Sequence, residues 1–565
     1  RTVKQGLATA DDFRFVRGWW EVDTLRAEEN WFPFAKGGAY SPFYADIHLV
    51  VNWSCNGAEI KSNLNESGGV RSNVWMLRDT AANYFFRPGI TWPLRARRFA
   101  PQAMPENCVF SVRGYSAFPE QDEEAKTLAL FNSSAFDYLF KTALGRFGYP
   151  EFIVGILQIM PWVECTVDQK TRLEEYARRA WSLKRTLDTI TETSHAFLLP
   201  PALSMRLGDY DVPAIEAELA CIQVEIDNIA FELYGFSDAD RAAALSSADI
   251  EATDDDLSDE DEEDDTVDGA SSADALLSWA VGVAFGRFDW RLATGERAAP
   301  SEPEPFDSLP SKSPGMLPDG VTPFHQHAGI LVDDQGHPHD LARLIEQVLE
   351  TVDASVAEDM RRWLQKDFFA FHLKRYSKSR RKAPIYWPLA TASGSYTLWL
   401  YYPSLSDQTL FTAVNDFVDP KLEDVRREQQ TLRDKGAGRS KQDEKSLEAL
   451  ASLEHELADL RDSLLEIAPN YRPNHDDGVQ ITAAPLWKLF RHKPWQKVLK
   501  DTWAKLEKGD YDWAHLAMSY WPDRVRDKCV TDKSLAIAHG LERLYVEPEP
   551  VEKKTRGRKK AGSTE

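Results

Sequence analysis

The sequence predicts an α+β protein in which a mixed, β-rich region is followed by a largely helical one. In residues 1–165, short runs of alternating apolar residues are separated by frequent turn signals. From Asp168 onward, apolar residues recur every three or four positions, which is the helical period. Hydrophobic residues make up 43% of the 565, enough for sizeable cores. At roughly 150 residues per domain, the length suggests three or four domains.

The first region is expected to be a compact mixed domain over residues 1–165. Segments 47–53 and 108–112 alternate as strands do. Glycine-containing turn signals interrupt the region repeatedly, at Gly37-Gly38, Asn56-Gly57, Gly68-Gly69 and Pro88-Gly89. The aromatic residues between these turns supply a core, and the turns predict long projecting loops.

The helical remainder is expected to fall into several parts. Helices are predicted at 168–193, 214–233 and 273–292, and they make a helical domain over 166–298. The expected parts after it are a Pro/Ser/Glu linker (299–335), helices with a strand pair (336–418), a helical hairpin (419–469), a C-terminal helical region (470–548) and a disordered tail (549–565).

Two of these parts have specific signals. The strand pair is predicted to turn at Ser393-Gly394. The hairpin is expected to be antiparallel and of coiled-coil type, because its leucines alternate by three and four residues from Leu450 to Leu464 and a glycine break separates the two helices. Its simplest role is a solvated structural arm, and a DNA- or partner-clasping arm is the alternative.

The charge balance is acidic and uneven. The chain has 67 Lys and Arg against 90 Asp and Glu, a net charge of −23. Residues 251–268 hold no base and supply much of the acid, so they predict a mobile acidic loop. This balance excludes a generally basic, histone-like binder but not a local basic groove.

The chain shows no membrane-spanning run and no secretory leader, so we expect no membrane partner. Its five scattered cysteines suit a reducing, cytoplasmic compartment. Because the sequence starts at Arg1 rather than Met, we expect it to be a fragment or to lack an upstream part.

Common catalytic motifs are absent from the sequence. There is no GxxxxGK[ST], HExxH, GxSxG or CxxC, which argues against a P-loop ATPase, a zinc protease and a serine hydrolase. The histidine pairs 325/327 and 337/339 resemble metal ligands, but a surface loop is the expected explanation, so no metal is predicted. The triplet 443–445 has the letters of a nuclease motif, yet it opens a helix where such charges are common. No catalytic residue is predicted.

Several blocks resemble one family of DNA-modifying enzymes. Gly6–Val16 resembles the signature that opens the target-recognition region of TaqI-type adenine-specific DNA methyltransferases. Blocks 36–38, 51–53, 56–60 and 84–92 follow in the order seen in PglX-like methyltransferases of the BREX and DISARM phage-defence systems, and blocks 372–388 and 509–518 also resemble that group. The resemblance covers most of the chain, although Ala10-Asp11-Asp12 departs from the family pattern.

The resemblance implies recognition without catalysis. The Asn-Pro-Pro-Tyr tetrapeptide that grips the target adenine is absent, and Ser41-Pro42-Phe43-Tyr44 lacks its amide side chain. We therefore expect the methyltransferase core, which uses S-adenosylmethionine, to lie elsewhere in the same gene or in an adjacent subunit. The chain alone is expected to bind no cofactor and to be inactive. It would be the C-terminal, target-recognition part of a restriction-modification or phage-defence enzyme, or a separate specificity subunit.

Double-stranded DNA is the partner that the resemblance implies, and other phage-defence proteins are further candidates. Arginine reads guanine, asparagine reads adenine, and lysine neutralises phosphate. Six of the nine residues 374–382 are basic within an acidic chain, and they are expected to contact the DNA backbone. The expected DNA-binding residues are Arg14, Lys36, Arg71, Asn73, Arg78, Arg87, Lys374, Arg375, Lys378, Arg380, Arg381 and Lys382.

Two other functions fit parts of the sequence. A non-catalytic DNA-binding or scaffold subunit of a phage-defence complex would explain the helical hairpin, the linkers and the missing core. An RNA-binding regulator rests only on the interleaving of basic and aromatic residues. An upstream or adjacent reading frame with the tetrapeptide would separate recognition from scaffolding.

Overall fold

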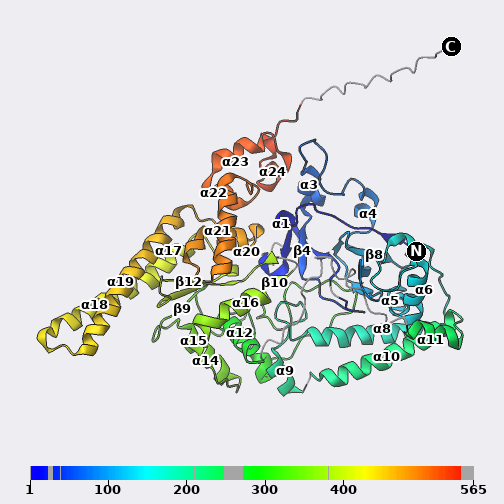
Figure 1. The fold of residues 1–565 in the computed structure, drawn as a ribbon, viewed down its shortest axis with the longest axis horizontal. Coiled ribbons are helices and arrows are strands. Elements are labelled where there is room, and N and C mark those ends of the chain that lie inside the picture. Colours follow the sequence, from blue (N-terminus) through cyan, green and yellow to red (C-terminus); the bar gives the residue numbers. More distant parts are fainter. Residues whose placement is uncertain are drawn as a thin grey trace, which may run out of the picture.

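A computed structural model describes residues 2–22, 30–38, 40–208, 210–246, 272–378 and 381–548. Helices predominate and the strands form small sheets, so the predicted α+β class is confirmed (Figure 1). The expected acidic loop 251–268 and the expected tail 549–565 lie outside these ranges.

Two four-stranded sheets organise the N-terminal region. The first has the order β1-β8-β5-β6, with every neighbouring pair antiparallel, and the second has the order β2-β4-β3-β7, with β3 and β7 parallel. The strands are β1 (Thr2–Lys4), β2 (Val16–Gly18), β3 (Trp31–Ala35), β4 (Leu49–Asn52), β5 (Gly89–Pro93), β6 (Gln102–Met104), β7 (Val109–Phe110) and β8 (Gly114–Phe118). The N-terminal segment therefore supplies one edge strand to each sheet.

Short helices connect these strands, and further helices cover the first sheet by sharing its core. The connecting helices are α1 (Asp12–Phe15), α3 (Ser54–Ser62) and α4 (Arg78–Asn83). The covering helices are α5 (Glu124–Phe131), α6 (Ser134–Leu144), α7 (Val154–Ile159), α8 (Val167–Asp188), α10 (Val212–Leu233) and α11 (Asp238–Ser246). Helix α8 begins with a capping box in which Thr166 and Gln169 bond each other's backbone N–H. Because α8 packs on α5 and α10, the expected boundary at 165/166 does not separate two cores.

A second core joins the N-terminal region to the helical remainder. Trp19 and Trp20 are almost fully buried in the same cluster as α12 (Ser272–Ala284). The indole N–H of Trp19 donates to the Thr193 carbonyl, and that of Trp20 donates to the Ala383 carbonyl. Two short helices, α9 (Pro201–Leu207) and α13 (Arg291–Thr294), lie at the edge of this cluster. The N-terminal sheets are therefore fixed firmly against the rest of the protein.

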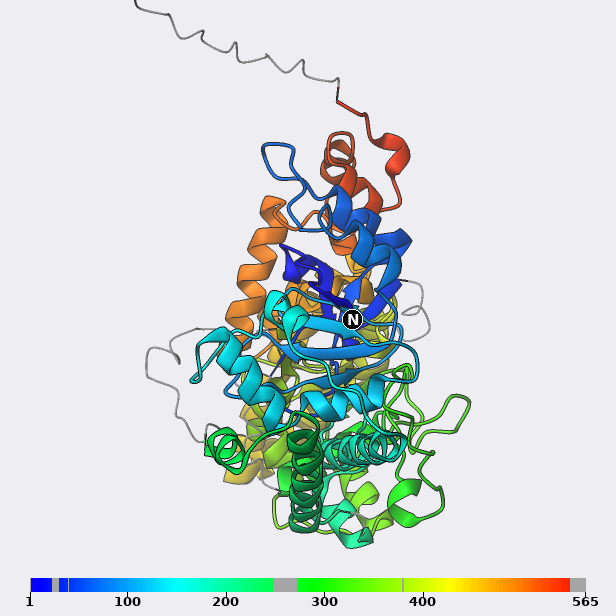
Figure 2. The same cartoon turned by 90° about the vertical axis from the view of Figure 1, so that its right-hand side faces the viewer.

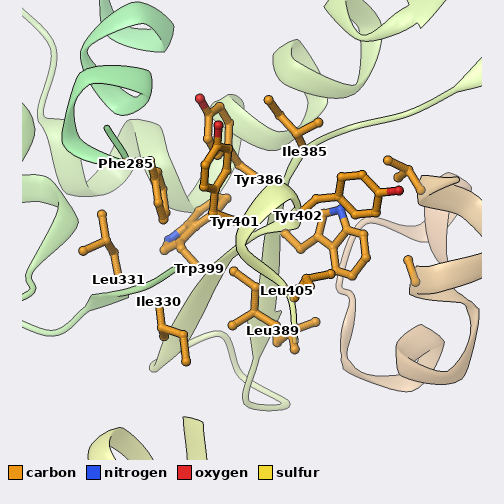
Figure 3. Close-up of a cluster of buried hydrophobic side chains, with 14 of the residues drawn as sticks. Phe285, Ile330, Leu331, Ile385, Tyr386, Leu389, Trp399, Tyr401, Tyr402 and Leu405 are labelled. Carbon is orange, nitrogen blue, oxygen red and sulfur yellow. The ribbon is translucent and has the colours of Figure 1, made fainter. Parts of the chain in front are cut away.

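A three-stranded antiparallel sheet forms the centre of this second core. Its order is β12 (Tyr386–Ala390), β13 (Thr397–Tyr401), β9 (Ile330–Asp333). Gly394 has a φ of +76° in the turn between β12 and β13, as the predicted turn at Ser393-Gly394 requires. Figure 3 shows the sheet's aromatic side chains; the Tyr386 ring stacks on those of Tyr401 and of Phe285, which follows α12. Helices α14 (Leu341–Thr351), α15 (Met360–Trp363) and α16 (Phe369–Arg375) pack beside it.

The structure differs from the expected linker over 299–335. Its last residues form β9, the edge strand of the central sheet. Earlier in the segment, Glu302 and Glu304 pair with Arg185 and Arg178 of α8, and the Phe306 carbonyl accepts from the Glu106 N–H. The proline-rich stretch therefore runs across α8 and the first sheet in defined contacts.

The C-terminal half is helical. Helices α18 (Asp419–Asp434) and α19 (Lys441–Ile467) lie side by side and project from the body in Figure 1. Arg426 and Gln429 of α18 both bond Glu454 of α19, at 2.7 and 2.8 Å. The other helices are α17 (Thr409–Ala413), α20 (Val479–Ala483), α21 (Lys493–Lys508), α22 (His515–Tyr520), α23 (Pro522–Cys529) and α24 (Lys533–Ala538). Helix α24 returns to pack on α3 of the N-terminal region, as both views show (Figures 1 and 2).

Candidate nucleic-acid interface

The expected DNA-binding residues fall in two segments that attach to the same N-terminal stretch. We call residues 63–78, between α3 and α4, the turn arm, and residues 374–382, at the end of α16, the basic hairpin. The turn arm is bonded to residues 6 and 8, and the basic hairpin to residues 12, 13 and 16. A single segment therefore holds both groups of cations in place.

The first half of the turn arm is a small, tightly turned loop. The backbone N–H of Asn65 donates to the Gly69 carbonyl, and Leu64 pairs with Val70. The Asn65 side-chain oxygen accepts from the N–H groups of Ser67 and Gly69, at 3.0 and 2.9 Å. This is the asparagine-centred turn that the side chain's short reach favours. The loop is therefore held by its own hydrogen bonds and places Arg71 at its base.

The second half of the turn arm is anchored by Asn73. Its side-chain amide donates to the Gly6 carbonyl at 2.9 Å, and its oxygen accepts from the Ala8 N–H at 2.8 Å. Val74 and Leu77 are buried in the cluster of the second sheet. Backbone bonds from Met76 to Asn73 and from Leu77 to Val74 close the turn between them. Asn73 was expected to read a base, but in this conformation both ends of its amide are occupied by the protein's own backbone.

Three of the expected arginines are exposed on or beside the turn arm. Arg71 uses one guanidinium N–H to bond the Leu64 carbonyl at 3.2 Å. Arg78 is the first residue of α4, and Arg87 lies over the Tyr84 ring with 5.6 Å to its centroid. Within the ranges that the structure describes, none of the three forms an ion pair. Their charges are thus available to an outside partner.

Acidic groups near the turn arm oppose its arginines only weakly. Asp79 follows Arg78 but is paired with Lys4 at 2.5 Å. Hydrogen bonds from Lys4 and Asn83 hold the pKa of the exposed Asp79 carboxyl below its ordinary value. Glu66 is exposed at the tip of the loop. Within residues 63–87, the three arginines therefore outnumber the two acidic residues in an otherwise acidic chain.

Arg381 of the basic hairpin makes its contacts with other groups of the protein. Strands β10 (Ser377–Lys378) and β11 (Arg381–Lys382) form a short antiparallel pair after α16. The Arg381 guanidinium donates to the carbonyls of Asp12 and Phe13, each at 3.2 Å, and to that of Val16. It also lies 3.5 Å from the fully buried Glu21 carboxylate. Because only 10% of its side chain is exposed, Arg381 is not available for a DNA contact in this conformation.

The other cations of the basic hairpin differ in their surroundings. Arg375 points toward the buried carboxylate of Glu192, at 3.8 Å, and lies over the Phe371 ring. Lys374 is exposed, and Lys378 and Lys382 are half-buried. Arg380 lies outside the described residues. Lys374 is therefore the most exposed cation among the described residues of this segment.

Two further expected contacts are engaged in ion pairs within the protein. Arg14 is buried, and its guanidinium bonds Glu59 at 2.8 Å and Ser534 at 2.9 Å, which ties α1 to α3 and α24. Burial raises the pKa of the Glu59 carboxyl despite the charge of Arg14. Lys36 pairs with Asp12 at 2.6 Å. Burial opposes ionisation of Asp12, but Lys36, Thr9 and Arg381 together outweigh it and lower the carboxyl pKa. We leave Arg14 out of the proposed contacts for this reason.

Sequence patterns missed the two most exposed apolar side chains of the turn arm. Trp75 and Met76 stand between Asn73 and Leu77 and are 62% and 61% exposed. The only sequence signal for them was their place between two arginines, because nothing in a pattern distinguishes a surface tryptophan from the many buried ones.

The histidine pairs form a cluster without the geometry of a metal site. His325 Nε2 lies 2.7 Å from His339 Nδ1, so the two rings share a hydrogen bond. Burial lowers the pKa of His325, His327, His337 and His339, to about 4 for His327. Across the residues with assigned structure, no group of three or more His, Cys, Asp or Glu could hold a metal ion. Over the same residues, no helix combines the length and apolar character needed to cross a bilayer.

Two curated proteins are similar to this chain over most of its length. The chain is 23% identical over 537 residues, 86% of its length, to adenine-specific methyltransferase PglX of Lacticaseibacillus casei (strain Zhang), of which it spans 42%. It is 23% identical over 472 residues, 72% of its length, to adenine-specific methyltransferase BrxX of Escherichia coli O9:H4 (strain HS), of which it spans 35%. The chain thus spans less than half the length of these relatives. No protein-family model matches it. The expected resemblance to PglX-like methyltransferases is confirmed.

Proposed function

We propose that this chain is the DNA-recognition part of a site-specific N6-adenine DNA methyltransferase of a phage-defence system. The observation that carries the proposal is the similarity of 86% of the chain to an adenine-specific methyltransferase, although the chain itself has no Asn-Pro-Pro-Tyr tetrapeptide. In this proposal, methyl transfer from S-adenosylmethionine takes place in a part of the enzyme that the chain does not include.

The exposed charges support a division of labour on the DNA. Arg71, Arg78 and Arg87 carry planar guanidinium groups that can bond guanine O6 and N7 together. Arg71 and Arg78 belong to the turn arm, which is held by hydrogen bonds, and Arg87 lies beside it; base reading requires such rigidity. Lysine is a point charge that neutralises phosphate on any sequence. We therefore assign base reading to the arginines of the turn arm and backbone contact to Lys374, Lys378 and Lys382.

Selection from a random library tests the proposal directly. The purified chain is mixed with duplex DNA that carries a randomised central segment, and the bound molecules are sequenced. We expect enrichment of one motif that contains adenine. Binding without any enriched motif would favour a non-catalytic DNA-binding or scaffold subunit, and absence of binding would contradict both functions.

Cofactor binding gives an independent test. If the catalytic pocket lies elsewhere, titration of S-adenosylmethionine into the chain should give no stoichiometric heat at micromolar concentration. The full enzyme, with its methyltransferase core present, is the positive control. Micromolar binding by the chain alone would place the cofactor pocket in this chain. It would refute the proposal that recognition and methyl transfer lie in separate parts of the enzyme.

A further inference from the structure

Trp75 differs from the other tryptophans of the chain. All 18 tryptophans lie in the described ranges, and Trp75 is the only one with an exposed side chain. Its neighbour Met76 is equally open to water. A large aromatic residue normally buries most of its surface, because contact with water is unfavourable for apolar area. Two adjacent apolar side chains held in solvent therefore indicate a contact that this chain does not supply.

The turn prevents these side chains from folding inward. Val74 on one side and Leu77 on the other are anchored in the core, and Asn73 is tied to the N-terminal segment through both ends of its amide. The Met76 N–H donates to the Asn73 carbonyl at 2.9 Å, which closes the turn directly under the pair. The exposure of Trp75 and Met76 is thus imposed by a rigid backbone and does not arise from a loose loop.

The charges around the pair identify the kind of partner. Arg71 lies four residues before Trp75 and Arg78 three residues after it, and both are exposed without an ion pair among the described residues. The exposed apolar pair lies between two cations. A matching partner would have an apolar surface between negative charges. Duplex DNA has this composition, with phosphates along both edges of each groove and stacked bases between them.

We propose that Trp75 and Met76 form a wedge that inserts between stacked base pairs while Arg71 and Arg78 hold the flanking phosphates or base edges. Apolar side chains that enter a base step separate the bases and kink the duplex. The inference rests on the proposed DNA-recognition function and adds a mechanical role to it. Such a wedge lowers the work of extruding a neighbouring base, which an enzyme acting on a base must do.

A duplex with one weakened step tests the wedge at a known position. Two duplexes of about 30 base pairs, roughly three helical turns, are compared. One is fully paired, and the other has a central mismatch beside a 2-aminopurine, whose fluorescence rises when it unstacks. Because a mismatched base costs less to unstack, the wild-type chain should bind the mismatched duplex about tenfold more tightly. Binding should also raise the 2-aminopurine fluorescence.

The decisive variant removes the wedge and leaves the charges. Trp75→Ala combined with Met76→Ala should bind the paired duplex within about threefold of wild type, since the arginines remain, but should lose the preference for the mismatch and the fluorescence rise. Trp75→Phe should retain both, because a phenyl ring also stacks. Met205→Ala, at another exposed methionine in α9, is the matched control and should behave as wild type.

Each outcome separates the wedge from the proposed function. If the double variant keeps the mismatch preference, or if wild type binds the paired duplex without any preference, the wedge is refuted and DNA recognition stands. If wild type binds neither duplex, both proposals fall.

Discussion

The turn arm and the basic hairpin carry similar charges in sequence, but the structure uses them differently. The turn arm exposes Arg71 and Arg78 and uses an uncharged residue, Asn73, for its attachment. The basic hairpin is attached through one of its own cations, Arg381, the first residue of β11. A cluster of basic residues in sequence therefore indicates an exposed basic surface only where an uncharged residue attaches the segment to the rest of the protein.

The position of Arg381 has a simple physical origin. Helix α1 is only one turn long, so its carbonyl groups mostly accept from outside the helix: the Val16 N–H bonds that of Asp12, and Arg17 bonds that of Phe13. Arg381 donates to the carbonyls of Asp12, Phe13 and Val16, which places a cation at the negative end of the helix. The N-terminal segment that carries the turn arm is therefore held by the basic hairpin.

Removal of Arg381 should have the largest effect on stability. Arg381→Ala removes a donor from three carbonyls and a cation from the buried Glu21 carboxylate, which keeps its bonds from the Gly18 and Val479 N–H groups, so the cost should be about 3 kcal/mol. Arg78→Ala, at an exposed arginine without a partner among the described residues, should change stability by less than about 0.5 kcal/mol. Urea denaturation followed by circular dichroism measures both. Equally small effects of both substitutions would show that Arg381 stabilises the fold no more than Arg78 does. The proposed difference between the two segments would then be wrong.

The asparagine anchor of the turn arm should matter less and more locally. Asn73→Ala leaves the Ala8 N–H and the Gly6 carbonyl without their partner, at a cost of about 1–3 kcal/mol. Hydrogen exchange at Met76 and Leu77 should accelerate, because the turn loses its attachment. Asn83→Ala, whose amide bonds Asp79 on the exposed side of α4, is the control. Unchanged exchange in the Asn73 variant would leave its amide free to read a base.

The two segments should also differ in their response to pH. His372 Nε2 accepts the backbone N–H groups of Ile385 and Tyr386 beneath the basic hairpin. Burial holds the pKa of His372 well below its ordinary value, and Arg287 and Arg375 lower it further. The folded state therefore resists a proton that the unfolded chain takes up near pH 6.5. Stability is complete above that pH and should fall by up to about 1.4 kcal/mol per pH unit below it.

His372→Gln separates this contribution from other acid effects. The Gln side chain can still accept a hydrogen bond but binds no proton, so the stability of the variant should depend less on pH between 7 and 5 than that of wild type. The turn arm contains no histidine, and its exchange rates should follow only the ordinary intrinsic pH dependence. Identical pH profiles for wild type and the variant would exclude His372 as the sensor.

Local patterns predicted those elements whose partners lie nearby in sequence. Strands β12 and β13 alternate and flank a Ser-Gly turn, so both strands and their pairing follow from some twenty residues. Strand β9 was missed, because its partner β13 lies far along the chain and prolines surround it. The same limit explains Asn73, since the backbone groups that occupy its amide belong to residues 6 and 8. The sequence indicated where basic residues are concentrated, but not which of their side chains form contacts within the folded protein.

One measurement tests the central claim, that the turn arm selects the DNA sequence. Random-library selection is repeated with Arg71→Ala, Arg78→Ala and Arg87→Ala singly, and with Lys374, Lys378 and Lys382 replaced together by Ala. A lost bidentate contact removes about 1–3 kcal/mol of discrimination at one base, so at least one arginine variant should relax the enriched motif at a single position. The lysine variant should enrich the same motif and bind all duplexes more weakly, with a salt slope reduced by about 0.9 per lost phosphate contact. If all three arginine variants enrich the wild-type motif unchanged, the turn arm does not read the sequence and the account is wrong.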